Sequence, residues 1–162
     1  VFRKTNSAFI KVGDREEIMA QLDWAKEHVE RYRASKGGDG HIWTGFDGNG
    51  NFPCLLLTTT GRISGQARTT PLIYGRDSDK LIVIGSQGGR PKHPNWYLNL
   101  DADPRVAVQV KDDLFEAKAR TANPEERARL WPMMAEIYPP YNEYQEKAGD
   151  EREIPVVVLT RV

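Results

Sequence analysis

The chain reads LLLTTTGRISGQAR from Leu55 to Arg68, and this stretch decides its fold. The apolar and β-branched run 55–60 is typical of a strand, and the glycines within 61–66 indicate a turn. Further strands are predicted over 69–74, 80–85, 105–110, 114–121 and 154–159. The first two connections are shorter than the crossover of about a dozen residues that parallel neighbours need. We therefore expect an antiparallel sheet, closed into a barrel, in an α+β domain.

Helices are predicted on both sides of this strand-rich region. Their expected ranges are 14–36, 94–100, 124–138 and a short segment after Pro140 that reaches Lys147. The first helix ends at two glycines, and Gly37–Asn51 is expected to be a loop with a short strand near 41–44. Asn123 precedes Pro124 and lies three residues before Glu126, which is the pattern of a capped helix start. A polar turn is predicted at 76–79.

The composition is that of one globular domain, with 162 residues, 39% of them apolar and 28% charged. We treat 1–162 as a single domain in which residues 1–51 carry the N-terminal helix and loop and residues 52–162 form the barrel. The apolar runs are far shorter than the roughly 20 residues of a membrane helix. Residues 1–10 mix basic and polar residues, so we expect no signal peptide there. Cys54 is the one cysteine, which fits a reducing compartment, and we expect a cytoplasmic protein.

The charge of the chain is zero in sum but uneven along the sequence. It has 23 basic and 23 acidic side chains, which argues against a protein that binds nucleic acid over its whole surface. Residues 52–100 hold 6 basic and 2 acidic side chains, whereas residues 101–162 hold 9 and 13. The first of these segments also holds 6 of the 14 glycines. A basic, glycine-rich segment in a neutral protein indicates a local anionic ligand.

Several familiar catalytic patterns are absent from the sequence. The three histidines are far apart and the single cysteine gives no cluster, so no metal site is expected. Gly61–Gly65 differs from the G-x-S-x-G pattern because Ser64 stands one place late, which leaves a serine hydrolase unsupported. The chain also lacks the G-K-[ST] ending of a phosphate loop and a G-x-G-x-x-G segment between strand and helix.

Two loops carry the features of an anion site. Arg62 and Arg68 flank the first glycine turn, and guanidinium groups match phosphate and carboxylate geometry. Segment 85–93 adds three glycines and two cations before a helix start, which favours anions through its dipole. A hairpin turn with solvated arginines is the alternative for the first loop. Two such loops in one small domain favour an anion-binding groove.

Two groups of aromatic residues stand out, one directly after the loop 85–93 and one near residue 140. Trp96 and Tyr97 beside the cations suit a planar, conjugated ligand with an anionic tail, although one ring can be core and the other a lid. Tyr138, Tyr141 and Tyr144 are three residues apart and share a face if their segment is helical. They are candidates to line a pocket or to donate a proton, and ordinary helix packing is the alternative.

Together these segments resemble the deazaflavin-dependent nitroreductase family, in its F420H2-dependent quinone reductase branch. The matching stretches are Leu55–Arg68, Pro71-Leu72, Gly85–Gly89, Pro94–Leu100, Asn123–Pro132, Ile137–Tyr144 and Ile154–Val158. They cover about residues 52–160, whereas the N-terminal helix matches only loosely. The resemblance implies a split β-barrel related to FMN-binding barrels, with helices packed on it, that binds coenzyme F420. This cofactor is a deazaflavin ring joined through a phosphate to an oligoglutamate tail.

The resemblance also implies roles for individual residues. The residues that it places on the phosphate and tail are Arg62, Ser64, Gln66, Arg68 and Lys92. Those that it places around the ring are Pro71, Leu72, Ser86, Gln87, Asn95 and Trp96, with Ser86 and Gln87 acting through backbone N–H groups. On the substrate side the match gives Tyr138, Tyr141 and Tyr144, and with Ser86 these are the candidate catalytic residues. Ile63 and Gln87 depart from the family pattern, because relatives often have a cation at these positions.

The expected function is an F420H2-dependent reductase that transfers a hydride to a quinone, a nitro compound or an activated enone. An FMN-dependent reductase with the same barrel is one alternative, and a non-catalytic F420 carrier is another. The expected partner is a small-molecule acceptor, with no nucleic acid, and the chain is a monomer or a homodimer. Helix 14–36 carries mixed charges on its polar face, so we favour its packing against the barrel over contact with a membrane surface.

Overall fold

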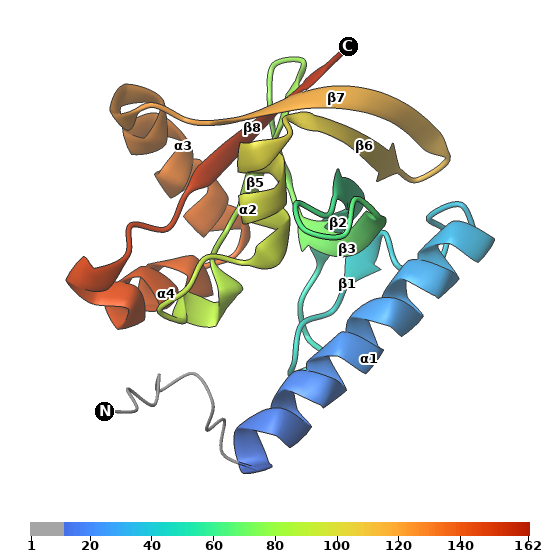
Figure 1. The fold of residues 1–162 in the computed structure, drawn as a ribbon, viewed down its shortest axis with the longest axis horizontal. Coiled ribbons are helices and arrows are strands. Elements are labelled where there is room, and N and C mark those ends of the chain that lie inside the picture. The colour runs from blue at the N-terminus through green and yellow to red at the C-terminus, as the bar shows by residue number, and fades with distance from the viewer. Residues whose placement is uncertain (1–11) are drawn as a thin grey trace.

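The computed structural model describes the chain from residue 12 to residue 162, with side chains from residue 19 onward. The strands are β1 (Ile42–Trp43), β2 (Phe52–Thr60), β3 (Ala67–Ile73), β4 (Gly75–Asp77), β5 (Lys80–Ile84), β6 (Arg105–Val110), β7 (Asp113–Thr121) and β8 (Val156–Arg161). They form one curled antiparallel sheet in the order β1-β2-β6-β7-β8-β5-β4, with β3 paired to β2 (Figure 1). The α+β split-barrel prediction is confirmed. The expectation about a signal peptide concerns residues outside the described part.

The decisive stretch forms the β2–β3 hairpin. Its register runs from Thr60 opposite Ala67 to Cys54 opposite Ile73. A single residue, Tyr74, then separates β3 from β4, which pairs with β5. The chain therefore passes from the β2 side of the sheet to the β5 side almost without a break, and this curls the sheet into a barrel.

The prediction of a polar turn over 76–79 was wrong for its first half. Gly75–Asp77 forms β4, opposite Lys80–Ile82, and only Ser78 and Asp79 make the turn. Ser78 takes the left-handed conformation, with φ of 55°, that such a two-residue turn requires. Polar composition therefore concealed a short strand at the edge of the sheet.

The sheet buries side chains on both faces, which produces two cores. Leu55 and Leu57 point into the barrel, whereas Leu56 points outward beneath the first helix. The same alternation in β5 and β8 places Ile82 and Val158 on the outer face. Two-residue periodicity explains this arrangement, because successive strand side chains point to opposite faces. The outer face of β5 and β8 is the surface on which the C-terminal helices pack.

The helices cover the sheet on its outside and at one end. They are α1 (Val12–Ala34), α2 (Asn95–Ala102), α3 (Pro124–Ile137) and α4 (Pro140–Ala148), with short 3₁₀ turns η2 (Gln87–Gly89) and η3 (Gly149–Glu151). Helix α3 begins with the predicted capping box, in which Asn123 and Glu126 exchange side-chain to backbone hydrogen bonds. Pro94 is the N-cap of α2 rather than its first helical residue. No helix in the described range is long and apolar enough to cross a membrane.

Helix α1 packs against the barrel, as expected. Val29 and Tyr32 are buried against Leu56 on the outer face of the sheet. The Tyr32 hydroxyl donates to the Cys54 carbonyl oxygen at 3.0 Å and accepts from the Lys111 backbone N–H at 2.8 Å. Figure 1 shows α1 passing beside β1, β2 and β3, so that it lies next to the glycine turn of the hairpin. This position allows α1 to contribute to a site at that end of the barrel.

Candidate functional site

The glycine turn between β2 and β3 is closed by its own hydrogen bonds. The Gly61 N–H donates to the Gln66 carbonyl oxygen at 2.8 Å, and the Gly65 N–H donates to the Gly61 carbonyl oxygen at 2.8 Å. The Ser64 hydroxyl accepts from the Gln66 N–H at 3.2 Å. Ser64 and Gln66 therefore shape the turn that presents the neighbouring Arg62 and Arg68.

Arg62 is held in place by the helix that faces this turn. Its backbone N–H and its Nη1 both donate to Oδ1 of Asn99, at 3.1 and 3.0 Å, and its Nη2 donates to Oδ1 of Asn95 at 3.4 Å. Asn99 is buried and also donates to the Thr59 hydroxyl at 3.2 Å. The arginine side chain is exposed but ordered by these contacts before any ligand binds, which lowers the entropy lost on binding.

A groove of about 820 Å³ lies between this turn, the start of α2 and helix α1. Its lining includes the predicted Arg62, Ser64, Arg68, Gln87, Asn95 and Trp96, together with Leu22, Ala25, Lys26, Val29, Glu30 and Arg33 of α1. Four cations, Lys26, Arg33, Arg62 and Arg68, face one carboxylate, Glu30. The structure therefore brings most of the predicted cofactor residues together around a positively charged groove.

One wall of the groove was missed by the sequence analysis. Lys26 and Arg33 lie seven residues apart on α1, which is the spacing of one helix face. Arg33 Nη2 donates to the Thr69 hydroxyl at 2.8 Å, which ties α1 to β3. The sequence interpretation favours packing of this helix against the barrel, and the helical spacing of its cations is the signal that identifies the wall.

Other predicted cofactor residues lie beside the groove rather than in its lining. Pro71 is buried, and Leu72 packs against the barrel core together with Trp96. The Gln66 and Lys92 side chains are exposed and belong to none of the groove walls. The Lys92 carbonyl oxygen accepts a hydrogen bond from Gln87 Nε2 at 3.3 Å. Lys92 therefore supports the loop through its backbone.

The loop 85–93 contacts the groove through Gln87. Ser86 has helical backbone angles, and Gln87 then turns to the left-handed region with φ of 46°, followed by Gly88 with φ of 63°. A right-handed residue followed by a left-handed one directs successive backbone N–H groups to one side, which is an anion-binding arrangement. A left-handed conformation is unfavourable for glutamine and is a mark of a functional segment.

The three tyrosines form an aromatic cluster with Trp43 and Phe52. The Tyr138 and Tyr144 hydroxyls are 3.0 Å apart, and the ring centroids of Tyr138 and Tyr141 are 4.9 Å apart. Tyr138 and Tyr141 are buried within the outer core, and burial raises the pKa of each phenol above its usual range. None of the three is among the residues that line the groove.

The tyrosine cluster contacts the loop 85–93 at Gly89 rather than at Gln87. Gly89 lies so close to the Tyr144 backbone that a β-carbon there would come within 2.4 Å of the carbonyl oxygen, and its φ is 76°. Only glycine fits this position. The turn η2 thus contacts the groove at Gln87 and the tyrosines at Gly89.

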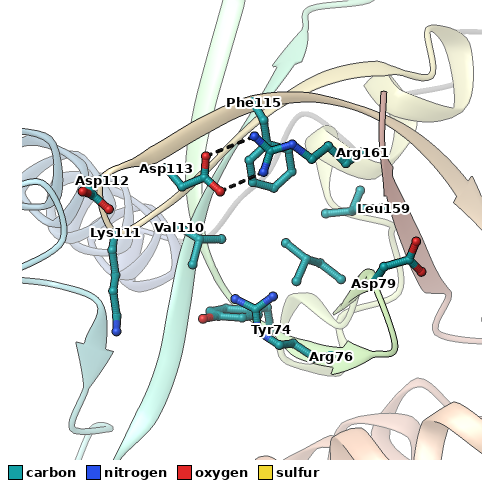
Figure 2. Close-up of a pocket in the computed structure, with 11 residues that line it drawn as sticks. Tyr74, Arg76, Asp79, Val110, Lys111, Asp112, Asp113, Phe115, Leu159 and Arg161 are labelled. Carbon is teal, nitrogen blue, oxygen red and sulfur yellow. Dashed lines mark hydrogen bonds and ion pairs between the residues drawn. The ribbon is translucent and has the colours of Figure 1, made fainter.

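A second cavity, of about 400 Å³, is lined by residues of β4, of β8 and of the turn between β6 and β7 (Figure 2). Tyr74, Arg76, Val110 and Lys111 line part of it, and Arg161 is paired with Asp113 across its rim. It contains none of the residues predicted to bind a cofactor. The candidate site is therefore the groove beside α1, α2 and the two glycine-containing loops.

The fold is that of a split-barrel protein, and its groove is lined by four cations, one carboxylate and the aromatic side chain of Trp96. Residues 24–161 match the model of the F420H(2)-dependent quinone reductase family. The chain belongs to this family, whose cofactor is F420. The match decides between the two cofactors in favour of F420, and the groove fits it, because a polyanionic tail requires several cations and the ring requires an aromatic neighbour such as Trp96.

Individual relatives agree with this assignment. An F420H(2)-dependent quinone reductase of Mycobacterium tuberculosis is 41% identical over 137 residues, which cover 83% of this chain and 87% of the relative. A solved F420-H2 dependent reductase, FDR-A, is 44% identical with a TM-score of 0.61 over 66% of this chain and 93% of its own. Another solved relative, described as a domain-swapped dimer, is 39% identical with a TM-score of 0.62 and covers 86% and 98% of the two chains.

Proposed function

We propose that this F420H2-dependent reductase transfers a hydride to a quinone, with nitro compounds and activated enones as further acceptors of the same type. The observation that carries the proposal is the groove lined by four cations, one carboxylate and Trp96. Cations at that density suit a phosphate and several glutamates more than the single phosphate of FMN. The quinone is the acceptor in the name of the family and of the mycobacterial relative.

In this proposal the chain binds the cofactor at both ends. Arg62 and Arg68, with the turn residues Ser64 and Gln66, hold the phosphate and the first part of the tail. Lys26 and Arg33 of α1 add a second row of cations across the groove. Around the ring we assign Pro71, Leu72, Asn95 and Trp96, together with the N–H groups of Ser86 and Gln87. Lys92 is assigned to the tail by resemblance and by its charge.

When bound, F420H2 supplies two electrons and two protons, the hydride leaving from C5, which together convert a quinone to a hydroquinone. The residues of the chain orient the acceptor and exclude water. Burial raises the pKa of Tyr138 and Tyr141, which makes both phenols weaker acids than an ordinary tyrosine. A phenol with a raised pKa is a hydrogen-bond donor rather than an acid that gives up its proton. The resemblance assigns Tyr138, Tyr141 and Tyr144, with Ser86, to orientation of the acceptor oxygen, although none of the three tyrosines is among the residues that line the groove.

The test is a titration followed by turnover. Fluorescence titration should give tighter binding of F420 than of FMN. Mixing the protein with F420H2 and menadione should restore the absorbance of oxidised F420, and a nitro compound and an enone should be compared with menadione at equal concentration. Tight F420 binding without reduction of any acceptor would favour the carrier alternative and contradict the reductase.

We also infer that the chain forms a homodimer. Met19 and Leu22 of α1 are exposed although both are apolar, which suits a surface that a partner covers. The solved relative described as a domain-swapped dimer supports this inference. Light scattering on purified protein should give about twice the chain mass, and a mass of one chain would contradict it.

A further inference from the structure

Arg152 is a buried arginine without a carboxylate partner. It follows η3, and its residue surface is only 5% exposed. None of the ion pairs in the described part of the chain includes it. Burial of an unpaired guanidinium is unfavourable unless all of its donors are satisfied. A buried cation of this kind needs an explanation beyond core packing.

The guanidinium donates to both ends of the loop that borders the groove. Its Nη1 donates to the Gly85 carbonyl oxygen at 2.9 Å, its Nη2 to that of Ser86 at 2.6 Å, and its Nε to that of Arg90 at 3.0 Å. Nη1 is also 3.0 Å from Nδ1 of His93. One side chain thus gathers three carbonyl groups whose dipoles would otherwise repel one another.

The geometry of the peptide group determines where the N–H groups that follow these carbonyls point. In a planar trans peptide the carbonyl oxygen of one residue and the N–H of the next point in opposite directions. The Gly85 and Ser86 carbonyls point at Arg152, so the N–H groups of Ser86 and Gln87 point away from it. Neither N–H donates to another backbone group in the described chain. Both are therefore available to a ligand.

The strained backbone of the loop gives a second, independent indication. Gln87 lines the groove, and its φ of 46° is a backbone conformation that residues other than glycine rarely adopt. Such a conformation persists only when surrounding contacts determine it. The Ser86 carbonyl oxygen accepts from Arg152 at 2.6 Å and from the Gly89 N–H at 2.9 Å, and these two bonds fix the peptide group that enters Gln87.

We propose that Arg152 is a positioning residue, which anchors the Gly85 and Ser86 carbonyls and thereby aims the N–H groups of Ser86 and Gln87 at the ring of F420. The inference rests on the proposed function, because it assigns those N–H groups to cofactor binding. Arg152 itself does not touch the groove. Its effect passes through the backbone of the loop, so a change at Arg152 alters the affinity for the ring without changing the cations that bind the tail.

The main variants are Arg152→Met, which removes all donors, and Arg152→Lys, which keeps the charge but cannot reach three carbonyls at once. The matched control is Arg127→Met. Arg127 is also partly buried and donates to a carbonyl, that of Ile154, and to Gln145, but it has no contact with the loop. Fluorescence titration with F420 should give a dissociation constant raised at least tenfold by Arg152→Met, less by Arg152→Lys, and less than twofold by Arg127→Met.

A second measurement does not depend on the cofactor. Hydrogen exchange of the free protein, followed by mass spectrometry, should show faster exchange over 85–93 in both Arg152 variants, with 55–60 unchanged in Arg152→Lys. If Arg152→Met does not fold, Arg152→Lys carries both measurements. Wild-type affinity together with unchanged exchange in Arg152→Lys and Arg152→Met would overturn the proposal. Failure of the wild-type protein to bind F420 would instead contradict the proposed function, while the exchange measurement would still test the role of Arg152 in the loop.

Discussion

Oδ1 of Asn99 accepts two hydrogen bonds from Arg62, one from its backbone N–H and one from its guanidinium. Because Asn99 belongs to α2 and Arg62 to the β2–β3 turn, this single amide oxygen joins the two elements that form one end of the groove. Asn99 is 3% exposed, so the contact is shielded from competing water. It explains why an otherwise exposed arginine has a defined position.

The first prediction concerns this contact. Asn99→Ala should reduce the free energy of unfolding by about 1–3 kcal/mol, because the buried Thr59 hydroxyl loses its donor and Arg62 loses the acceptor of two hydrogen bonds. It should also weaken F420 binding, because Arg62 loses its support. Urea unfolding and fluorescence titration measure the two effects. Asn95→Ala is the comparison for stability, and its longer, exposed bond to Arg62 of 3.4 Å should make its cost much smaller.

The second prediction concerns Arg68, which lines the groove and is exposed. Arg68→Ala should raise the F420 dissociation constant roughly tenfold, in line with the loss of one charge-assisted contact. It should also make binding less sensitive to salt, since one fewer ion pair is screened. Titrations at low and high salt provide the measurement. Arg105→Ala, an exposed arginine that is not in the groove lining, should change neither value.

The third prediction concerns Tyr32, which fastens α1 to the barrel. Its hydroxyl bonds the Cys54 carbonyl oxygen and the Lys111 N–H, and burial raises its pKa to about 12. Tyr32→Phe should reduce the free energy of unfolding by about 1–3 kcal/mol, because both buried partners lose their bond. Tyr97→Phe is the control, since its hydroxyl bonds Thr121 on the surface. Equal urea midpoints for the two variants would contradict the role given to Tyr32.

The fourth prediction concerns pH and His93. Burial, and then the charge of Arg152, lowers the pKa of His93, while Asp101 acts weakly in the opposite direction. The ring lies against that of Tyr97 at a tilt of 53°, with 4.8 Å between centroids. Nδ1 must be unprotonated to accept from Arg152. The unfolded chain binds the proton more readily, so this stabilisation is present above the unfolded pKa of about 6.5 and is lost as pH falls through the lower folded value.

His93→Gln provides the measurement, because an amide accepts a hydrogen bond without titrating. The wild-type urea midpoint should fall between pH 7 and pH 5 by more than that of His93→Gln. The comparison at each pH removes the contribution of His41, whose pKa is also lowered by burial. Parallel pH profiles for the two proteins would show that His93 does not support the loop in the way described.

Most of the sheet and its helices could be predicted because their patterns are local. Strand β2 is an apolar run that ends in three β-branched threonines, and the capping box of Asn123 and Glu126 lies within four residues. The exception was β4, which is polar and short and is defined by its pairing with β5. Pairing partners distant in sequence leave no periodic signal in so short a segment.

The site was predicted in part for the same reason. Arg62 and Arg68 stand out beside glycines, and both line the groove. Asn99 and Arg152 gave no signal, because their roles come from contacts 37 and more than 60 residues away along the chain. An asparagine inside a helix and an arginine in an acidic segment look like surface residues. Their burial follows only from the packing of α2 and of the segment after α4.

The two cationic walls of the groove have a consequence for the protein without its cofactor. Lys26 and Arg33 on α1 face Arg62 and Arg68 on the barrel, so the walls repel each other until an anion lies between them. In the proposed binding mode the cofactor tail is a shared counterion that draws α1 toward the barrel. Added salt should consequently have opposite effects on the two forms. It relieves the repulsion in the free protein and weakens the attraction that holds the complex together.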